Sequence, residues 1–369
     1  MSGLEIIGWG LLCAAGSGTA ELVGALTSPP TPADVTGMYA EPLPSPRAYA
    51  LVNFNARAEL GRKGTSFMDR RTSLTVVACG RALQDAELQI TDSNRRRIGV
   101  VLGTTAGSVK SSVDYAVETF TQDRPYMVNP ALFPNTVMNC AAGQSAIWFG
   151  LNGINTTVAG GRLALLSVLR YCINAFRSRA ADFLLAGAVD EFTPHTAWRW
   201  QLRRPNAQTL PGEGGAVFVV RPAADGAANR GQPDGEVLGV ALGFCPSNAD
   251  RVAAIAGCVR RALRHSGMAP RQIRFAAIGG SDCAEADSTS WRAIDEALER
   301  SRPQRLEIDK RITGDNESAT SALELAAILA LHRHDADLDG QASLLVAQNT
   351  EGAIGAAVIR GWNRGSHRR

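Results

Sequence analysis

The chain has 369 residues, of which 45% are hydrophobic and 20% charged, with a formal net charge of +3. This length and apolar content allow a sizeable core, while the balanced charge argues against nucleic-acid binding. No apolar run reaches the roughly 20 residues needed to cross a bilayer, and the first residues lack a signal-peptide pattern, so we expect a soluble, cytoplasmic protein with no membrane anchor.

The first part of the chain alternates apolar strand patterns with one long helix pattern. The helix pattern begins near Arg162 and carries Leu163, Leu166, Val168, Leu169 and Cys172 at mixed three- and four-residue steps. The polar stretch 222–236, which contains Gly, Pro, Asn and Asp, predicts a loop after this block. The predicted strands are 4–8, 98–103, 154–158, 183–187 and 216–220.

The second part repeats this alternation. Strands are predicted at 237–244, 275–278, 344–347 and 355–359, and helices at 249–265, 288–299 and 317–331. Alternating strands and helices indicate βα units and a largely parallel sheet. We therefore predict a duplicated α/β fold, with residues 1–221 and 237–369 as its two halves and helices held between two sheets.

The cysteines and histidines give no metal-site pattern. None of the seven cysteines forms a C-x-x-C pair, and most lie in apolar segments, so we expect buried free thiols without disulfides, metal or cofactor. His332 and His334 fall in the polar tail of a helix pattern and are expected in solvent. The run Arg95–Arg97 is expected to be a solvated turn.

Three passages carry a family resemblance by their order and spacing. The first is Asn129–Asn135 with the following segments 142–145 and 149–153, the second is Leu184–Asp190, and the third is the glycine-rich turn in Leu210–Val217. Together they resemble the β-ketoacyl-acyl-carrier-protein synthase family of the thiolase fold. The resemblance covers nearly the whole chain and implies a five-layer αβαβα sandwich.

The resemblance also implies an active site that this chain lacks. The family uses a cysteine thiolate at the N-terminus of a buried helix and two histidines that stabilise the developing enolate. Counting from Gly153 and from Gly187 places Arg162 at the cysteine position. The histidine positions correspond to Gly279 and Asp315. The family lysine remains as Lys310, but an arginine stays protonated and cannot be a nucleophile.

Arg162 needs an anionic partner if it is buried. A helix N-terminus already carries about half a positive charge, and an unpaired buried cation costs several kcal/mol. Asp315 is the expected partner, with Glu317 or Asp287 in reserve. The alternative is that Arg162 turns to solvent as a helix cap.

A synthase-like chain without its nucleophile resembles the chain-length factor, the β subunit of type II polyketide ketosynthases. Those subunits commonly carry glutamine at this position, and arginine departs from the pattern. The resemblance implies a heterodimer with a catalytic ketosynthase, which an acyl carrier protein loads. It also implies that this subunit closes the end of an acyl tunnel at the interface.

The tunnel end maps to the predicted helix 108–119, with Ser111, Ser112 and Tyr115 as inward positions. Small serines would leave a long or narrow tunnel. Together with the arginine at the nucleophile position, they favour a reducing, polyene-type system over an aromatic one. The alternative is an ordinary amphipathic interface helix.

Two other functions stay open from the sequence. One is a decarboxylase or acyltransferase that uses Cys140 or Cys172, although both histidines that would stabilise an enolate are missing. The other is a homodimeric acyl-binding protein. In the family, subunits join partly through the strand that corresponds to 154–158. An obligate interface of more than about 2,000 Å² would leave an isolated subunit poorly soluble.

Overall fold

The fold was taken from a computed structural model. The structure describes residues 3–204, 209–223, 233–279, 284–299 and 301–363, without the side chain of Lys310. Within these residues, no helix combines the length and the apolar character that spanning a membrane requires.

Ten strands form one sheet in the order β10-β9-β11-β12-β8-β1-β7-β6-β4-β5. A separate two-stranded ribbon contains β2 (Ala33–Asp34) and β3 (Arg47–Ala48). The strands of the large sheet are β1 (Leu4–Leu12), β4 (Ile98–Thr104), β5 (Asn155–Ala159), β6 (Phe183–Asp190), β7 (Gly214–Pro222), β8 (Gly235–Phe244), β9 (Ile273–Ile278), β10 (Gln304–Leu306), β11 (Ala342–Gln348) and β12 (Ala353–Gly361).

The sheet consists of two five-stranded groups with the same topology. In the first group, β4 lies parallel to β5 and β6, and β7 runs antiparallel to β6 and β1. In the second, β9 lies parallel to β10 and β11, and β12 runs antiparallel to β11 and β8. Leu4–Ile6 of β1 pair with Gly235–Val237 of β8 and join the groups. The duplicated α/β fold is confirmed.

The predicted largely parallel sheet was wrong, because both groups are mixed. The chain returns from β11 to β12 through residues 349–352, and a connection this short can only join antiparallel strands. The βα alternation therefore correctly predicted the parallel strands that helices connect. It did not predict that the last strand of each group, β7 or β12, runs antiparallel.

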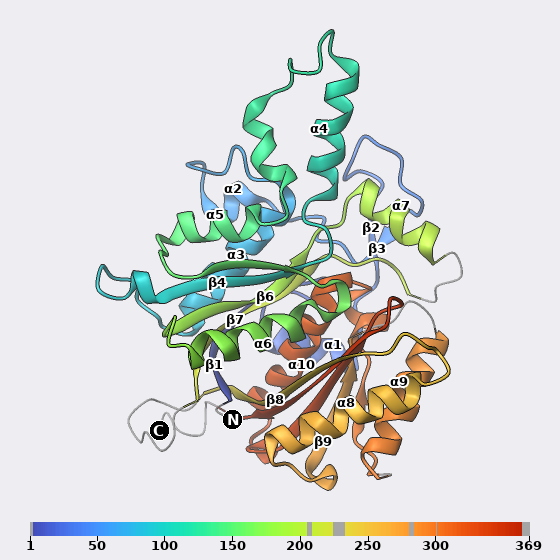
Figure 1. Cartoon of the computed structure of the whole chain (residues 1–369). Helices are drawn as coiled ribbons and strands as arrows, with labels where there is room; N and C mark the ends of the chain where they lie inside the picture. Colours follow the sequence, from blue (N-terminus) through green and yellow to red (C-terminus); the bar gives the residue numbers. More distant parts are fainter. Residues whose placement is uncertain (1–2, 205–208, 224–232, 280–283, 300, 364–369) are drawn as a thin grey trace.

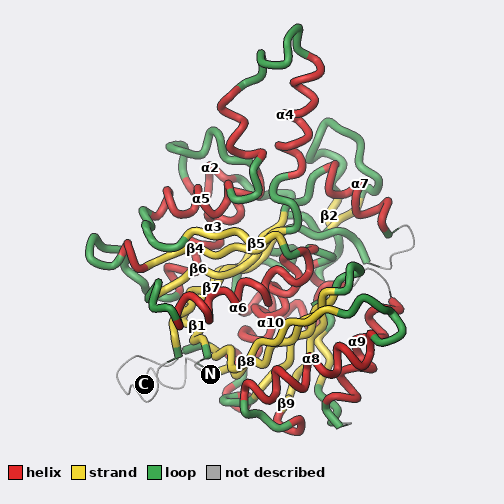
Figure 2. The backbone as a smooth tube through the Cα atoms, viewed as in Figure 1, coloured by secondary structure: helices red, strands yellow, loops and turns green. Residues whose placement is uncertain are grey.

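Helices cover both faces of each group, which gives the five layers visible in Figures 1 and 2. α3 and α5 cover the outer face of the first group, α6 and α10 lie between the groups, and α8 and α9 cover the second. The helices are α1 (Thr19–Thr27), α2 (Ala56–Leu60), α3 (Arg70–Asp85), α4 (Val109–Thr121), α5 (Cys140–Phe149), α6 (Ala164–Arg177), α7 (Pro194–Arg203), α8 (Arg251–Ser266), α9 (Ala284–Ala297) and α10 (Thr320–His334).

The central helix α10 is buried around its whole circumference, as a helix between two sheets is expected to be. Every residue from Thr320 to Ala330 is buried. His332 is also buried, with no exposed surface, so the expectation that it is solvated was wrong. The end of β12 covers its ring: a Cβ on Gly361 would lie 2.1 Å from His332 Cδ2. His334 is exposed as expected.

Other expectations from the sequence fit the structure. Six cysteines are buried free thiols, and Cys283 lies outside the described residues. Arg95–Arg97 form an exposed or half-exposed 3-10 turn.

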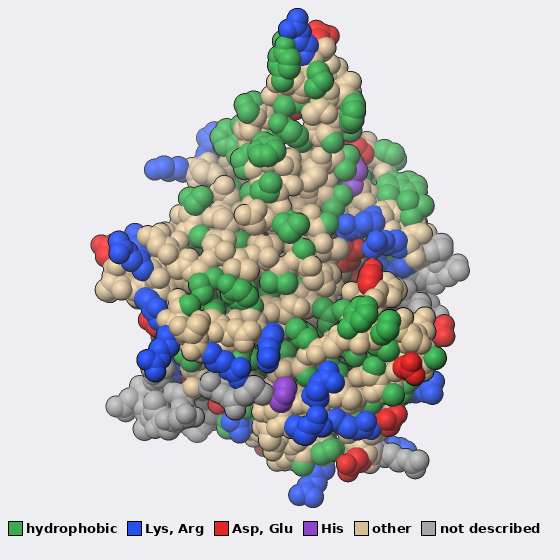
Figure 3. All heavy atoms as spheres, viewed as in Figure 1, with side chains coloured by type: hydrophobic (Ala, Val, Ile, Leu, Met, Phe, Trp, Pro, Cys, Tyr) green, Lys and Arg blue, Asp and Glu red, His purple; other side chains and the backbone are tan. Residues whose placement is uncertain are grey.

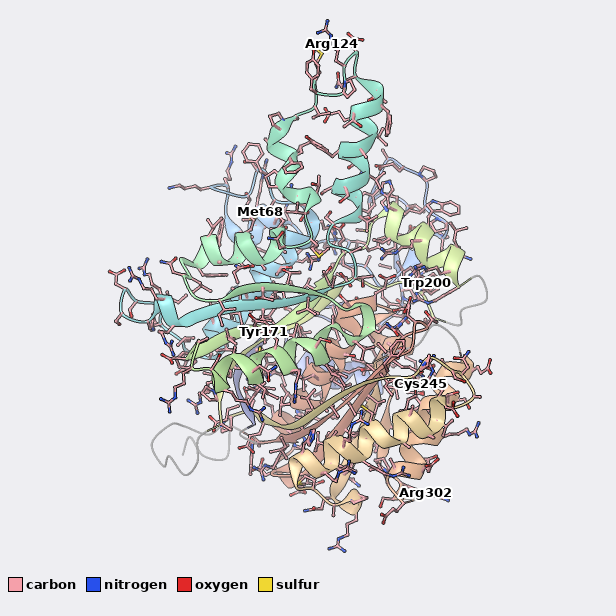
Figure 4. The ribbon with its side chains drawn as sticks, viewed as in Figure 1. Met68, Arg124, Tyr171, Trp200, Cys245 and Arg302 are labelled. Carbon is pink, nitrogen blue, oxygen red and sulfur yellow. The ribbon has the colours of Figure 1, made fainter. Side chains whose placement is uncertain are left out.

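An arm projects from the body of the molecule. It consists of α4 and the 3-10 helix η2 (Pro130–Thr136), with Arg124 at its tip (Figures 1 and 4). The rings of Tyr115 and Phe133 join the two sides, with centroids 5.8 Å apart. The arm exposes a series of large apolar side chains, namely Val117, Phe120, Tyr126, Met127, Leu132 and Phe133. Such a surface marks an interaction site when it is this extensive.

Candidate functional site

Arg162 lies where β5 passes into the central helix α6. It belongs to the 3-10 turn η3 (Gly161–Leu163), and Gly161 before it has a φ of +49°, which a glycine adopts without strain. Only 5% of Arg162 is exposed. The alternative of a solvent-facing helix cap is therefore excluded.

The predicted ion pair between Arg162 and Asp315 is present. Nη2 of Arg162 lies 2.7 Å from Oδ2 of Asp315, and both side chains are buried. Asp315 lies two residues before the 3-10 turn η6 (Glu317–Ala319), which leads into α10. The pair thus links the N-terminal ends of the two central helices, α6 from the first strand group and α10 from the second.

Asp315 has further partners that the sequence did not indicate. Nη1 of Arg204 lies 2.9 Å from Oδ2, and Trp200 Nε1 donates to the same oxygen at 3.1 Å. The backbone N–H of Glu317 donates to Oδ1 at 3.0 Å. Burial alone would raise the pKa of Asp315, but the charges of Arg162 and Arg204 overcome it and lower the pKa to about 2. Asp315 therefore stays ionised at neutral pH.

The glycine-rich turn holds Asp315 in place. The backbone of Asp315 exchanges hydrogen bonds with this turn, to Leu210 O at 2.9 Å and from Gly212 N at 2.8 Å. The close approach requires glycine, since a Cβ on Gly212 would lie 2.2 Å from the carbonyl oxygen of Thr313. Glu213 beside it is fully buried and accepts two hydrogen bonds from Arg70, at 2.5 and 2.7 Å. This turn therefore connects both strand groups at the site.

The position corresponding to the first family histidine has no room for a side chain. A Cβ on Gly279 would lie 2.2 Å from Ser321 Oγ and 3.1 Å from Ala347 Cβ. The carbonyl oxygen of Gly279 instead accepts a hydrogen bond of 3.4 Å from Arg162 Nη1. Gly279, Arg162 and Asp315 are thus brought together. The side chain of Lys310 lies outside the described residues.

The two reserve partners of Arg162 have other positions. Glu317 pairs with Arg199 at 2.5 Å, and Asp287 lies buried on α9. Trp200 is labelled at the site in Figure 4. No signal in the sequence distinguished Arg204 and Trp200 from their neighbours in the basic and aromatic segment 198–204.

A second buried polar cluster lies next to the site and was also missed. Asp190 accepts from Ser318 N at 3.0 Å, and its carboxylate lies 3.8 Å from Arg71 Nε. Glu191 accepts from Ser108 Oγ at 2.9 Å and from the Arg71 backbone N–H at 3.2 Å. Burial raises the pKa of Asp190 to about 6 and that of Glu191, with the nearby Asp69, to about 8.

The three predicted tunnel residues lie on α4 and are all half-buried. Ser111 Oγ lies 2.9 Å from Ser108 Oγ and borders an open hollow of about 420 Å³ beside Asp69 and Glu191. Ser112 Oγ donates to the carbonyl oxygen of Ser108 at 2.9 Å, and Tyr115 packs on Phe133. Their role in a tunnel stays a prediction.

The space beside the Asp315 network is too small for a substrate. The cavity bordered by Thr105, Asp190, Trp200, Asp315 and Glu317 measures about 20 Å³, which holds about one water molecule. Arg162 cannot release its proton, and the pair offers no nucleophile. The arrangement therefore holds two strand groups together and blocks the position that the resemblance assigns to catalysis.

Residues 8–227 match the N-terminal domain model of the β-ketoacyl synthases. The chain belongs to the β-ketoacyl synthase family. A 3-oxoacyl-[acyl-carrier-protein] synthase 2 from Synechocystis sp. is 27% identical over 67% of this chain, and the chain spans 64% of that relative's length. The enzyme of the same name from Staphylococcus aureus is 22% identical, over 79% of this chain and 75% of the relative.

Solved structures of synthases share the whole fold. The ishigamide ketosynthase/chain length factor superimposes with a TM-score of 0.86 at 30% identity and covers 98% of this chain and 100% of the other. A β-ketoacyl synthase from Burkholderia phymatum gives a TM-score of 0.82 at 17% identity, covering 98% and 100%. The thiolase-like synthase fold is therefore confirmed.

Proposed function

We propose that this synthase-family chain is a non-catalytic chain-length factor. It pairs with a catalytic ketosynthase and bounds the end of the tunnel in which that subunit's polyketide chain grows. The observation that carries the proposal is the buried Arg162–Asp315 pair at the nucleophile position, 2.7 Å between its charged atoms. A site filled in this way has neither a thiolate nor space for an acyl group.

Similarity supports the same assignment. The solved structure at 30% identity is that of the ishigamide ketosynthase/chain length factor. Another neighbour of the same fold is a type II polyketide synthase acyl-carrier protein in complex with its ketosynthase. We propose the corresponding partners for this chain, a ketosynthase bound directly and a carrier protein bound by the complex.

The two thiols considered for the enzyme alternative, Cys140 and Cys172, are not suited to catalysis. Cys172 is fully buried in α6, and burial raises the pKa of its thiol far above neutrality. Burial likewise raises the pKa of Cys140, which lies beside Asp69. Both groups are therefore protonated at neutral pH and weakly nucleophilic.

The pairing surface is proposed to centre on β5. This strand is an edge of the ten-stranded sheet, and its residues Asn155–Ala159 carry no charge. An uncharged edge offers unpaired backbone groups to a second chain. Together with the apolar arm and Ile147 of α5, which is 74% exposed, it provides the surface that a permanent partner would bury.

Purification of the full chain with and without a candidate ketosynthase tests the function. The chain alone should neither decarboxylate malonyl-carrier protein nor extend an acyl chain, and the complex should do both. The matched control is the complex in which the partner's catalytic cysteine is replaced by alanine, which should not extend an acyl chain although this chain is intact. Chain extension by the isolated chain, or by that control, would refute the proposal.

Product length tests the tunnel residues. Ser111→Phe or Ser112→Phe in the complex should shift the products to shorter chains by mass spectrometry, because each fills space beside α4. Ala20→Phe, at an exposed position of α1 outside the arm and β5, is the control and should leave the distribution unchanged. Unchanged products from both serine variants would show that these positions do not bound the tunnel.

A further inference from the structure

Helix α6 is buried on most sides but exposes one polar stripe. Its exposed or half-exposed residues follow helical spacing and are Ser167, Arg170, Tyr171, Asn174 and Arg177. Positions three and four apart lie on one face of a helix. The central helix of the fold thus reaches the surface along a single line that contains two arginines.

This stripe faces the same way as the edge strand β5. The hydroxyl of Thr156, in β5, donates to Tyr171 Oη at 3.1 Å. Tyr171 is labelled in Figure 4, beside the strand. Since Thr156 neighbours the middle residue of the strand, Thr157, α6 passes the strand near its centre. Arg170 is the residue before Tyr171, so it belongs to the part of α6 that passes the centre of β5.

Helix α8 adds further cations to the same face. Arg261 donates to Leu242 O at 3.2 Å, and His265 lies 3.2 Å from Val240 O, which places both side chains over β8. Arg264 follows one turn further on and is exposed. Figure 3 shows Lys and Arg side chains gathered over α6 and α8, with few acidic side chains between them.

We call Arg170, Arg177, Arg261, Arg264 and His265 the basic face. Its four arginines have no carboxylate within ion-pair distance among the residues that the structure describes. This contrasts with the neighbouring Arg260, which pairs with Glu296 at 2.9 Å. The basic face is thus an uncompensated positive surface that begins beside an unpaired strand edge.

Two copies of this chain would pair poorly through β5. A two-fold axis through the centre of the strand would bring each Arg170 towards its own copy, since equivalent residues near such an axis meet. Like charges that face each other across an interface cost several kcal/mol. The backbone groups of the strand edge can hydrogen-bond to any extended chain, so the charged side chains beside the edge decide which chain binds there.

We infer that the basic face selects the partner subunit by charge, so that the chain pairs with a synthase-fold chain carrying carboxylates beside its own edge strand and not with itself. The inference rests on the proposed function. Beyond that function, the inference specifies that the catalytic subunit presents an acidic surface to this chain.

Charge reversal in the full chain tests this inference. Arg170→Glu/Arg261→Glu should weaken the complex with the ketosynthase at least about tenfold, measured by titration at low and high salt. The wild-type affinity should fall with added salt. The matched control is Arg271→Glu/Arg274→Glu, two exposed arginines elsewhere that also lack a carboxylate partner among the described residues. It should bind as the wild type does.

Mixing the wild type with the reversed variant gives a readout that needs no ketosynthase. If like charges prevent self-pairing, the two chains should form a mixed dimer by size-exclusion chromatography with light scattering, whereas wild type alone should not dimerise. A wild-type homodimer would overturn the inference.

The remaining outcomes separate the inference from the function. Unchanged ketosynthase binding by the reversed variant would overturn the charge selection and leave the chain-length function standing. Loss of carrier-protein binding with intact subunit pairing would also overturn it, because the basic face would then serve an acidic carrier. If the wild type binds no ketosynthase, the proposed function fails, and the mixing experiment still decides the role of the face.

Discussion

Replacing Arg162 with methionine should destabilise the protein by about 2 to 3 kcal/mol. Methionine retains the apolar part of the side chain but removes the guanidinium that lies 2.7 Å from Asp315. Breaking a buried pair typically costs about 3 to 5 kcal/mol. Arg204, Trp200 and the Glu317 N–H still bind the carboxylate, which reduces the loss.

The pKa of Asp315 gives a similar magnitude. A folded-state value of about 2, against the usual 3.8, corresponds to about 2 kcal/mol of stability. Because the folded pKa is lowered, this contribution is complete above pH 3.8 and is lost as the pH falls through about 2. In Arg162→Met the pKa should be higher, so acid unfolding should begin at a higher pH.

Urea unfolding followed by far-UV circular dichroism measures these differences. Asp315→Asn should cost more than Arg162→Met, because it leaves Arg162 and Arg204 buried without their carboxylate. Arg97→Met is the control, since its pair with Asp182 is exposed and should contribute less than about 1 kcal/mol. The reasoning fails if Arg162→Met is as stable as the wild type, or if Asp315→Asn is no worse than Arg162→Met.

Three further predictions concern catalysis, the backbone and pH. Arg162→Cys, in a complex whose partner lacks its own cysteine, should show no condensation, because Gly279 and Asp315 supply no histidine; restored product would contradict this. Gly214→Ala should lower the urea concentration at the unfolding midpoint strongly, since Gly214 has a φ of +123° and a Cβ there would lie 1.9 Å from Leu12 O. A free energy of unfolding within about 0.5 kcal/mol of the wild type would refute the predicted backbone strain. Glu191, with a raised pKa of about 8, should make the free energy of unfolding fall by up to about 1.4 kcal/mol per pH unit between pH 4.5 and 8. Glu191→Gln should flatten this slope. Parallel pH profiles of stability for the two proteins would show that Glu191 is not the group responsible.

Strands such as β4, β6 and β11 were predictable because each is a short, apolar run that the fold buries on both faces. The short, mostly exposed strand β10 was not predicted. The helix α3 was not predicted, although it covers much of the first strand group. Its sequence contains Gly80 and β-branched residues at Thr72, Thr75, Val76 and Val77, which are weak helix formers. Burial against β1 and capping by Asp69, whose side chain accepts from Thr72 N at 2.7 Å, outweigh that propensity.

The candidate site also contains residues that the sequence could predict and residues that it could not. Arg162 and Asp315 could be paired from the sequence, because the family resemblance places both at the same centre and a buried cation needs an anion. Arg204 and Trp200 could not, since their approach depends on where α7 ends in space. Long-range packing of this kind leaves no local pattern in the chain.

The position of β1 in the centre of the sheet affects how the chain can fold during synthesis. Leu4 pairs with both Pro222 and Val237, so β1 leaves the ribosome well before its partners, which lie more than 200 residues behind it. Contacts this distant in sequence form slowly. A nascent chain that stops at residue 221 would lack the β8 partner of Leu4–Ile6. We therefore expect folding to be completed only after the second strand group has emerged, which is also when a partner subunit could first meet a finished β5.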